Sequence, residues 1–444
     1  MKLEPHPNIL IESLRDIGYS FETAVSDIID NSISAGASEI KISLYIFDGN
    51  LTLTVTDNGT GLTRSELLEA MRFGSSDPRL ERQSDDLGRF GLGLKTASFS
   101  QCRKLTVVSK KEEATSCFCW DLDQIEKHHD WVIDEINDVS NLPKFESMPE
   151  HGTLVIWQNI DRIDRKKKAD FVKKLESHIG LVFHRFISPI RGLGAKKKTK
   201  IFLNGNPISA IDPFCRGFTA TQPEPLEELK PGVKMQVFTI PKKEKFPSEV
   251  EYKRYALPGG YIRNQGFFLY RANRLIKWGT WFGLHPKSAD SQLTRVQLDI
   301  DNSNDDEWTI DVKKVFAQLP SDVKSQIALL ISSFPLRSRK ALVPNLAARK
   351  HHAKDSVWKV QTSGNLLSCK LAFESPLVSF FYESLDEEQQ ENFESLVKII
   401  EDTLPVGTLF NFAQSMSLDF VTPNRSSKEK KVIDDYFEKA FRDD

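Results

Sequence analysis

The chain has 444 residues, a length that predicts two or three domains. Hydrophobic residues make up 39% of it and charged residues 27%, which is the composition of a globular protein and excludes collagen-like and wholly disordered chains. Its 60 lysines and arginines nearly balance 62 aspartates and glutamates, so the formal net charge is -2 and any contact with nucleic acid must come from local basic patches.

Two further properties of the sequence concern its compartment. No apolar run approaches the ~20 residues that span a bilayer, and the first residues lack the apolar core of a signal peptide. The five cysteines are scattered and odd in number, which favours reduced thiols over a disulfide framework or a zinc site. We therefore expect a cytoplasmic protein with no membrane partner.

The sequence up to residue 160 mixes helical and strand patterns. Apolar residues at helical spacing predict a helix over 21–34, and alternating residues on both sides of Asp48-Gly49-Asn50 predict a hairpin of strands 39–47 and 51–57. A capping box formed by Thr63 and Glu66 predicts a short helix that ends near Met71. The segments that follow are a polar surface loop over 73–86, a glycine-rich turn and helix over 88–100, and strands at 105–109, 116–120 and 153–157.

Beyond residue 160 a basic helix over 165–186 is followed mainly by strands. The expected strands are residues 200–203, 233–240, 266–276 and 296–300. From Pro320 the chain turns mainly helical, and residues 384–387 predict another capping box before an amphipathic helix that ends near Thr403. The sequence thus predicts three parts, an α/β domain over 1–160, a second α/β domain over 161–320 and a mainly helical region over 321–444.

Two motifs of the first domain place carboxylates where a ligand can use them. Asp27, Asp30 and Asn31 share one face of the first predicted helix, and an amide beside carboxylates suits magnesium, which prefers oxygen ligands. The alternative is a solvated polar stripe. The run Asp57-Asn58-Gly59-Thr60-Gly61 follows an apolar strand, where a carboxylate can accept a hydrogen bond from a base amine while backbone approaches the ligand. A tight turn is the alternative there.

Two further motifs follow in the chain. The stretch Gly88-Arg89-Phe90-Gly91-Leu92-Gly93-Leu94-Lys95 leads into a helix, so its backbone N–H groups and Lys95 are placed to meet phosphate oxygens. It matches neither a dinucleotide-binding unit, because no parallel βαβ unit precedes it, nor a P-loop. Gly152-Thr153 opens an apolar strand, from which the Thr153 hydroxyl could support the contact made by Asp57.

The order and spacing of these four motifs resemble the GHKL ATPase superfamily, which includes gyrase B, the large heat-shock chaperones, histidine kinases, MutL and the MORC proteins. Residues 26–37 (SDIIDNSISAGA) resemble the asparagine-bearing helix of MutL and MORC, and DNGTGL and GRFGLGLKTAS resemble the two glycine motifs. HGTLVIW resembles the closing strand, and the polar segment 73–86 falls where the family has its ATP lid. The resemblance implies a two-layer α/β sandwich of the Bergerat type followed by a transducer-like α/β domain.

The resemblance also implies roles toward ATP and Mg²⁺. Asn31 would coordinate the metal, Asp57 would bind the adenine amine, and Lys95 would hold phosphate together with the glycines of its motif. The nucleotide-binding set that it implies is Asn31, Asp30, Asp57, Gly59, Gly61, Gly88, Arg89, Phe90, Gly91, Leu92, Gly93, Leu94, Lys95 and Thr153. A transducer lysine usually reaches the γ-phosphate; Lys313 and Lys314 are the candidates, and Lys277 in the MORC-like run GFFLYRANRLIKW is a weaker one.

One position departs from the family pattern. Many hydrolysing members have a glutamate, the general base, four residues before the asparagine, and here that residue is Asp27. The shorter arm withdraws the carboxylate by ~1.5 Å, one C–C bond, and a misplacement of about 1 Å can cost ~100-fold in rate. We therefore expect Asp27 to act as the base with slow turnover, and Asp30 is the nearest alternative.

The resemblance suggests a nucleotide-gated clamp. MORC and MutL relatives close on DNA as ATP-driven dimers, so it implies a homodimer on ATP binding and sequence-independent DNA contact. Basic runs at 165–168, 196–198 and 336–354 suit such contact, although solvated surface lysines are the alternative. Likeness to stand-alone bacterial MORC proteins suggests partner proteins in restriction or phage defence.

Three rival functions were compared with the clamp. A histidine kinase needs a phosphoacceptor hairpin before residue 21, and the sequence offers none, so this function is rejected. A chaperone that acts on protein clients would share the ATPase and transducer patterns. A nucleotide-binding scaffold with negligible hydrolysis is consistent with Asp27 in place of glutamate.

Overall fold

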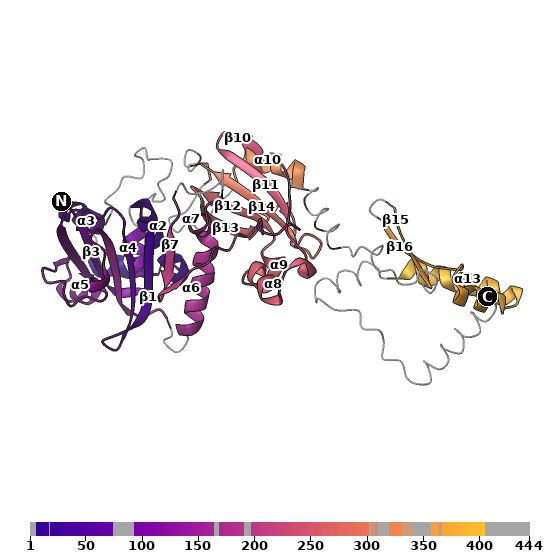
Figure 1. Ribbon diagram of the computed structural model, residues 1–444, viewed down its shortest axis with the longest axis horizontal. Helices are drawn as coiled ribbons and strands as arrows, with labels where there is room; N and C mark the ends of the chain where they lie inside the picture. Colours follow the sequence, from indigo (N-terminus) through magenta and orange to yellow (C-terminus); the bar gives the residue numbers. More distant parts are fainter. Residues whose placement is uncertain are drawn as a thin grey trace. The chain divides into compact units, whose positions relative to one another are not determined.

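The computed structural model describes residues 6–16, 18–73, 93–163, 168–190, 197–301, 304, 307–308, 319–331, 334, 338, 342, 357–363 and 366–404. The chain divides into two compact units (Figure 1). The first contains residues up to 338 except 288–290, and the second contains those three residues and the chain from 339 onward.

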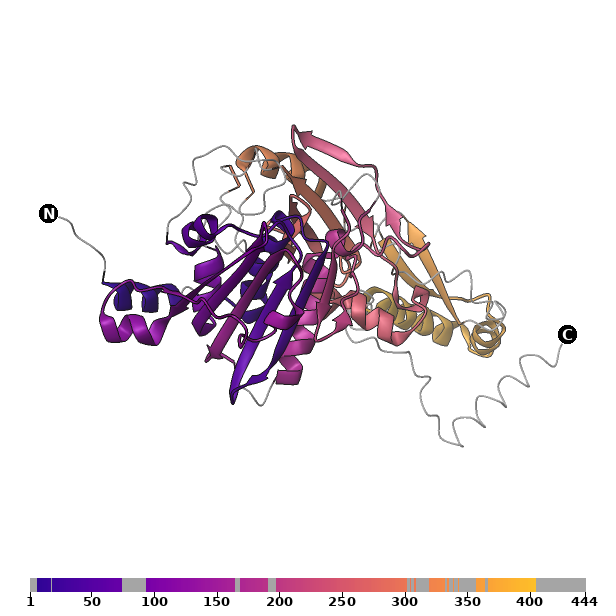
Figure 2. The same ribbon diagram turned by 60° about the vertical axis from the view of Figure 1, so that its left-hand side comes forward.

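The first unit contains an eight-stranded sheet in the order β5-β4-β3-β6-β2-β1-β7-β8, and Figure 2 shows strands of this sheet side by side. All neighbouring strands are antiparallel except β1 and β7, which are parallel. The strands are β1 Glu39–Phe47, β2 Asn50–Asp57, β3 Cys102–Lys111, β4 Ala114–Asp121, β5 Asp134–Glu135, β6 Gly152–Ile160, β7 Lys200–Leu203 and β8 Asn206–Pro207. The sheet therefore includes residues between 200 and 207, although we expected the second domain to begin at residue 161. The division of the chain into three parts stays a prediction.

The predicted β1–β2 hairpin is confirmed, with Phe47 opposite Asn50 across a two-residue turn. Asp48 and Gly49 have φ values of 47° and 75°, the left-handed conformation that this tight hairpin turn requires. The hairpin matters for the site because it ends with Asp57 opposite Ile40. Thr56 in turn lies opposite Leu154 of β6, so Asp57 lies near the start of that strand.

The helices of this part are α1 Pro7–Arg15, α2 Phe21–Ser34, α3 Arg64–Met71, α4 Gly93–Phe99, α5 Leu122–His128, α6 Lys168–Val182 and α7 His184–Ile187. Helix α2 has the predicted bounds: the Ser20 hydroxyl accepts from the N–H of Thr23 at its start, and Gly36, with φ of 74°, follows its end. The predicted capping box of Thr63 and Glu66 begins α3.

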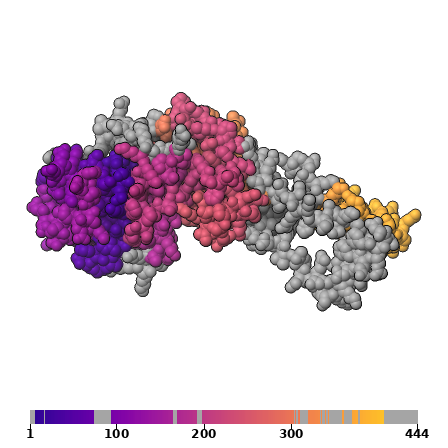
Figure 3. Space-filling view, in the orientation of Figure 1, coloured from indigo at the N-terminus to yellow at the C-terminus, as the bar shows by residue number. Residues whose placement is uncertain are grey.

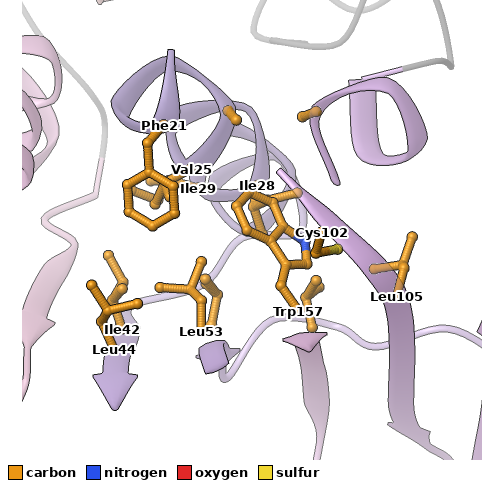
Figure 4. Packing of buried hydrophobic residues seen from close by; sticks show 14 of the residues in the cluster. Phe21, Val25, Ile28, Ile29, Ile42, Leu44, Leu53, Cys102, Leu105 and Trp157 are labelled. Atoms are coloured by element: carbon orange, nitrogen blue, oxygen red, sulfur yellow. The ribbon is translucent and has the colours of Figure 1, made fainter. Parts of the chain in front are cut away.

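The main core of the first unit lies between α2 and the first sheet (Figure 4). Helix α2 presents Phe21, Val25, Ile28 and Ile29 to the strands because these residues recur at helical spacing. The residues that meet them in this cluster include Ile42, Leu44, Leu53, Cys102, Leu105 and Trp157. A smaller apolar cluster that includes Val108, Leu154 and Met148 forms separately. This is the two-layer α/β arrangement that the sequence predicts.

A second sheet in the same unit has the order β10-β11-β14-β12-β13, with β9 paired to β11. Its strands are β9 Gln222–Pro223, β10 Glu227–Lys230, β11 Val233–Thr239, β12 Gly266–Arg271, β13 Arg274–Thr280 and β14 Thr294–Ile300; the accompanying helices are α8 Glu249–Ala256, α9 Gly260–Arg263 and α10 Ser321–Leu330. The prediction of one strand over 266–276 is wrong. Ala272 and Asn273 have φ values of 47° and 68°, so the chain turns there and forms the β12–β13 hairpin.

The core of the second sheet contains Trp281 and Trp308. Trp278 differs: it is half-buried, and its ring lies 5.9 Å from that of His178 on α6. Helix α7 makes further contacts with this sheet, because His184 Nε2 lies 2.9 Å from the Tyr270 hydroxyl and Arg185 pairs with Asp299. Side chains of the two sheets form one continuous surface in the space-filling view (Figure 3).

The second unit combines a hairpin of β15 Trp358–Ser363 and β16 Leu366–Leu371 with α12 Pro376–Glu383 and α13 Glu387–Thr403. Neither strand was predicted from the sequence. The capping box lies two residues further along the chain than predicted, and Asp386 and Gln389 form it. Aromatic rings pack together in this unit, since the Phe393 ring lies 6.2 Å from Phe373 and 5.4 Å from Phe381. Among the described residues of both units, no helix is both long and apolar enough to cross a bilayer.

Two isoleucines on β1 test the assignment of the core. Ile42 is 1% exposed and Ile46 is 52% exposed, although both belong to the same strand. Ile42→Ala should lower the free energy of unfolding by about 3 kcal/mol, because it leaves a cavity. Ile46→Ala should change it by less than about 0.5 kcal/mol. Urea denaturation of both variants measures these values, and equal losses would contradict the described packing.

Candidate functional site

Helix α2 carries three predicted site residues, which differ in exposure. Asp27 and Asp30 are 4% and 1% exposed, whereas Asn31 is exposed. The two carboxylates lie three residues apart and therefore share a face of the helix. They do not form the solvated stripe that was the alternative interpretation. A buried carboxylate requires hydrogen-bond or charged partners, and the structure supplies them.

The partners of Asp27 and Asp30 were not found from the sequence. The Tyr19 hydroxyl donates to Asp27 Oδ2 over 2.9 Å. Arg274 of β13 places its Nε 2.9 Å and 2.7 Å from the two carboxylate oxygens of Asp30, and its Nη2 lies 3.8 Å from Asp27 Oδ1. Arg274 belongs to the Asn-Arg-Leu-Ile-Lys run that the sequence analysis singled out, but no spacing pattern linked it to α2.

Asp57 ends β2 as a buried hydrogen-bond acceptor. Its Oδ2 accepts from the Ser32 hydroxyl over 2.7 Å, and its Oδ1 accepts from the N–H groups of Gly59 over 2.9 Å and Thr153 over 3.3 Å. Burial raises the pKa of Asp57, and these hydrogen bonds oppose the rise. A carboxylate has about four acceptor sites, so these three donors leave capacity for a further donor such as a base amine.

Thr153 meets Asp57 directly, and the expected contribution of its hydroxyl to ligand binding stays a prediction. Its backbone N–H, and not its hydroxyl, makes the contact with Asp57. The hydroxyl oxygen instead lies 3.3 Å from Ser109 Oγ, which donates to the carbonyl of Gly152. Ser32 is a further residue that the sequence analysis missed, because a serine inside an amphipathic helix carries no local signal of its partner.

Three glycines around Asp57 permit a close approach of the backbone. Gly61 has a φ of 66°, and a Cβ added to it would lie 2.1 Å from the Lys110 carbonyl oxygen. Gly152 has a φ of 125°, and a Cβ added to it would lie 2.0 Å from the Asp57 carbonyl oxygen. A Cβ on Gly59 would lie 2.8 Å from that of Ala35. His151 Nδ1 donates to the Gly59 carbonyl over 2.7 Å. Steric requirements of the fold therefore explain these glycines, and their nucleotide contact stays a prediction.

The second glycine motif is described only from Gly93 onward, and Gly88, Arg89, Phe90, Gly91 and Leu92 lie outside the described residues. Gly93 begins α4 close to the first motif, since an added Cβ would lie 3.8 Å from Asp27 Oδ2. Leu94 is half-buried and packs against the main core.

Lys95 is 1% exposed, and its ammonium group lies at the end of α3. It donates to the carbonyls of Ala70 over 2.8 Å and Arg72 over 2.7 Å. A cation is favourable there because the last carbonyls of a helix carry partial negative charge. Burial lowers the pKa of Lys95 to about 8, while Glu69 opposes the shift. These contacts attach Lys95 to α3, and its predicted contact with phosphate stays a prediction.

Several other residues that were predicted to bind phosphate or DNA lie outside the described part of the chain. Lys313 and Lys314 lie outside it, as do most of the basic runs, among them 165–167 and 343–354. Lys197 and Lys198 are described and exposed. Lys277, the weaker γ-phosphate candidate, has its ammonium 5.5 Å from the centroid of the Phe282 ring.

The oxygen donors on α2 are compatible with magnesium. Magnesium usually takes one or two protein oxygens and completes its shell with water and substrate phosphates. The exposed Asn31 amide is suited to such a role, with Asp27 four residues before it. Among the described residues there is no group of three or more histidine, cysteine, aspartate or glutamate side chains that could hold a metal alone.

Comparisons with known proteins agree with this geometry. The sequence profile of the family described as histidine kinase-, DNA gyrase B- and HSP90-like ATPase matches residues 19–153. Residues 19–153 form a GHKL ATPase domain. The matched segment contains all of α2, Asp57, α4 and the start of β6.

Three relatives of the GHKL domain illustrate its range. ATPase morc-1 of Caenorhabditis elegans is 33% identical over 90 residues, or 20% of this chain and 10% of that protein. The DNA mismatch repair protein MutL of Dictyoglomus turgidum is 31% identical over 117 residues, 26% of this chain and 19% of that protein. The chaperone protein HtpG of Rickettsia canadensis is 28% identical over 168 residues, 35% of this chain and 25% of that protein. The chain thus spans about a tenth to a quarter of these relatives' lengths.

The buried carboxylate of Asp57 predicts a dependence of stability on pH. Because the pKa of Asp57 is raised in the folded protein, the ionised form costs stability. This loss of stability is absent below the pKa of an ordinary aspartate. It develops as the pH rises from that value to the raised pKa of the folded protein. Asp57→Asn retains Oδ1 as acceptor for Gly59 and Thr153, and its amide can donate to Ser32 Oγ. Its free energy of unfolding, relative to wild type, should therefore increase from about pH 4 to pH 7.

Urea titrations at both pH values measure this difference, and Asp134→Asn, at an exposed aspartate on β5, controls for the change of charge. A difference for Asp57→Asn that falls with pH would show that the ionised carboxylate stabilises the fold.

Proposed function

We propose that the chain is a magnesium-dependent ATPase that acts as a nucleotide-gated dimeric clamp on DNA. The observation that supports nucleotide binding best is Asp57, a buried carboxylate with remaining acceptor capacity between a glycine turn and the start of β6. Its position within a GHKL domain supports adenine as the donor of the missing hydrogen bond.

Asn31 would hold the magnesium ion, which would offset negative charge on the phosphates. Asp27 would accept the proton of the attacking water as general base. The Tyr19 hydroxyl holds Asp27 Oδ2, so the carboxylate has a fixed direction without a metal. A Cβ added to Gly93 would lie 3.8 Å from the same oxygen, which supports a site shared by the second glycine motif and the proposed base.

Aspartate in place of glutamate supports a slow reaction and a long-lived ATP state. The carboxylate begins ~1.5 Å further back, and Asp27 is buried and bonded to Tyr19, which restricts its movement. A scaffold that binds ATP with negligible hydrolysis is the limiting case. A wild-type rate of ATP hydrolysis that is measurable, and that Asp27→Ala lowers, distinguishes the slow ATPase from the scaffold.

Asp27→Ala should lower the steady-state rate of ATP hydrolysis by about 100-fold, because it removes the general base. The KM for ATP should change much less, since Asp57 and the glycine motifs supply most of the binding. Glu22→Ala, at another acidic residue of α2, is the control. If Asp27→Ala hydrolyses ATP as fast as wild type, Asp27 is not the base.

The dimeric clamp rests on the likeness to MORC and MutL proteins. ATP would order the lid, two protomers would meet through their ATPase domains, and Lys313 or Lys314 would sense the γ-phosphate. DNA contact would come from the basic runs, of which Lys197 and Lys198 are described as exposed. Cytoplasmic location and partner proteins of a restriction or phage-defence system complete the proposal, on resemblance alone.

Dimerisation measured with and without DNA tests the clamp. Wild type should form dimers when ATP and magnesium are present, and Asn31→Ala should not, because the metal loses its protein ligand. Asn31 is exposed, so this substitution should leave the fold intact, which circular dichroism checks. DNA should prolong the wild-type dimer. Dimers that form equally well in all four combinations of variant and DNA would exclude nucleotide gating.

A chaperone is the second candidate function. The observation that favours it is the match to HtpG, which covers 35% of this chain and is longer than the MORC matches. Stimulation of ATP hydrolysis by unfolded protein, together with indifference to DNA, would favour the chaperone. Stimulation by DNA would favour the clamp.

A further inference from the structure

Arg274 reaches from the second sheet to the nucleotide helix. It is the first residue of β13, directly after the turn at Ala272 and Asn273, and it is only 3% exposed. Its guanidinium Nε lies 2.9 Å and 2.7 Å from the two carboxylate oxygens of Asp30, and Nη2 lies 3.8 Å from Asp27 Oδ1. One side chain therefore reaches both buried carboxylates of α2, those of Asp27 and Asp30.

The surroundings of Arg274 make this contact specific. Its Nη1 donates to the Leu275 carbonyl over 3.3 Å, and its guanidinium carbon lies 5.7 Å from the centroid of the Phe183 ring. His178 adds no second positive charge, because burial, aided by the charge of Arg274, lowers its pKa to about 3. His178 instead lies 3.1 Å from the Ser26 hydroxyl on α2. The guanidinium is the cation that faces Asp30 among these neighbours.

The branched guanidinium suits a position between two carboxylates. It presents nitrogens in a fixed plane, so it can bind Asp30 with Nε while Nη2 stays near Asp27. A lysine ammonium is a single point and could serve one carboxylate at a time. Because Asp30 and Asp27 lie three residues apart on α2, fixing one also restricts the direction of the other.

From this geometry we propose that Arg274 is a positioning residue that makes the rate of ATP hydrolysis depend on the placement of the second sheet. The inference rests on the proposed ATPase function. A shift of β13 relative to α2 changes the distance between the guanidinium and Asp27, and with it the alignment of the base. The second sheet thereby acts on the chemical step through a residue distinct from the candidate γ-phosphate lysines.

Arg274→Lys tests the proposal with the charge retained. Its kcat for ATP hydrolysis should fall by about 10- to 100-fold, because a base displaced by about 1 Å loses up to ~100-fold. The KM for ATP and the affinity for a non-hydrolysable ATP analogue should stay within twofold of wild type. Arg185→Lys is the matched control: Arg185 is also buried and binds Asp299 of β14, but it makes no described contact with α2. Its kcat should stay within twofold.

Equal losses of kcat in both variants would assign the effect to general loosening between the sheets and overturn the proposal. An unchanged kcat in Arg274→Lys would overturn it as well. Wild type that fails to bind the ATP analogue would instead refute the proposed function, so the two failures are distinguishable.

A second pair of variants separates positioning from charge balance. Arg274→Met should lower the melting temperature strongly, since it leaves Asp30 buried without its cation. Adding Asp30→Asn should restore most of the melting temperature, which establishes the ion pair without an activity measurement. The double variant should still have the low kcat of the Arg274 variants, because the Arg274 guanidinium no longer lies near Asp27. Recovery of wild-type kcat would show that Arg274 is only a counter-ion and overturn the proposal.

Discussion

Helix α2 is buried on two faces, one apolar and one polar, and the elements around it supply the partners that this burial requires. Its apolar face, with Phe21, Ile28 and Ile29, packs on the first sheet. Its polar face holds Asp27 and Asp30, which are nearly as inaccessible. Water therefore cannot solvate these carboxylates, and protein groups must do so. Tyr19 and Arg274 meet that requirement, and they bring an N-terminal segment and the second sheet to the same helix.

The end of strand β2 also holds a buried carboxylate whose partners are protein groups. Asp57 is buried, and its partners come from α2, from its own turn and from the start of β6. The glycines of this region allow backbone segments to approach more closely than any side chain would permit. A carboxylate held in this way has a fixed orientation in the absence of a ligand, and the proposed nucleotide would need to supply only one further donor. The site is therefore built from parts that also hold the fold together.

The sequence predicted those features whose signal is local. Helix α2, the β1–β2 hairpin and the Thr63 capping box were found because periodicity, turn residues and cap spacing lie within a few residues. The prediction was wrong where the same apolar pattern is compatible with either one long strand or a hairpin of two strands. The apolar run 266–276 was expected to be one strand, yet left-handed backbone at Ala272 and Asn273 divides it into β12 and β13.

For the site, the types and spacing of residues were sufficient to predict the GHKL ATPase domain, the acidic face of α2 and the turn after Asp57. The partners of these residues follow from tertiary packing alone: Ser32 and the Thr153 N–H for Asp57, helix-end carbonyls for Lys95, and Arg274 for Asp30. The reason is physical. Arg274 and Asp30 are 244 residues apart, and no periodicity links side chains that meet only because two sheets pack together.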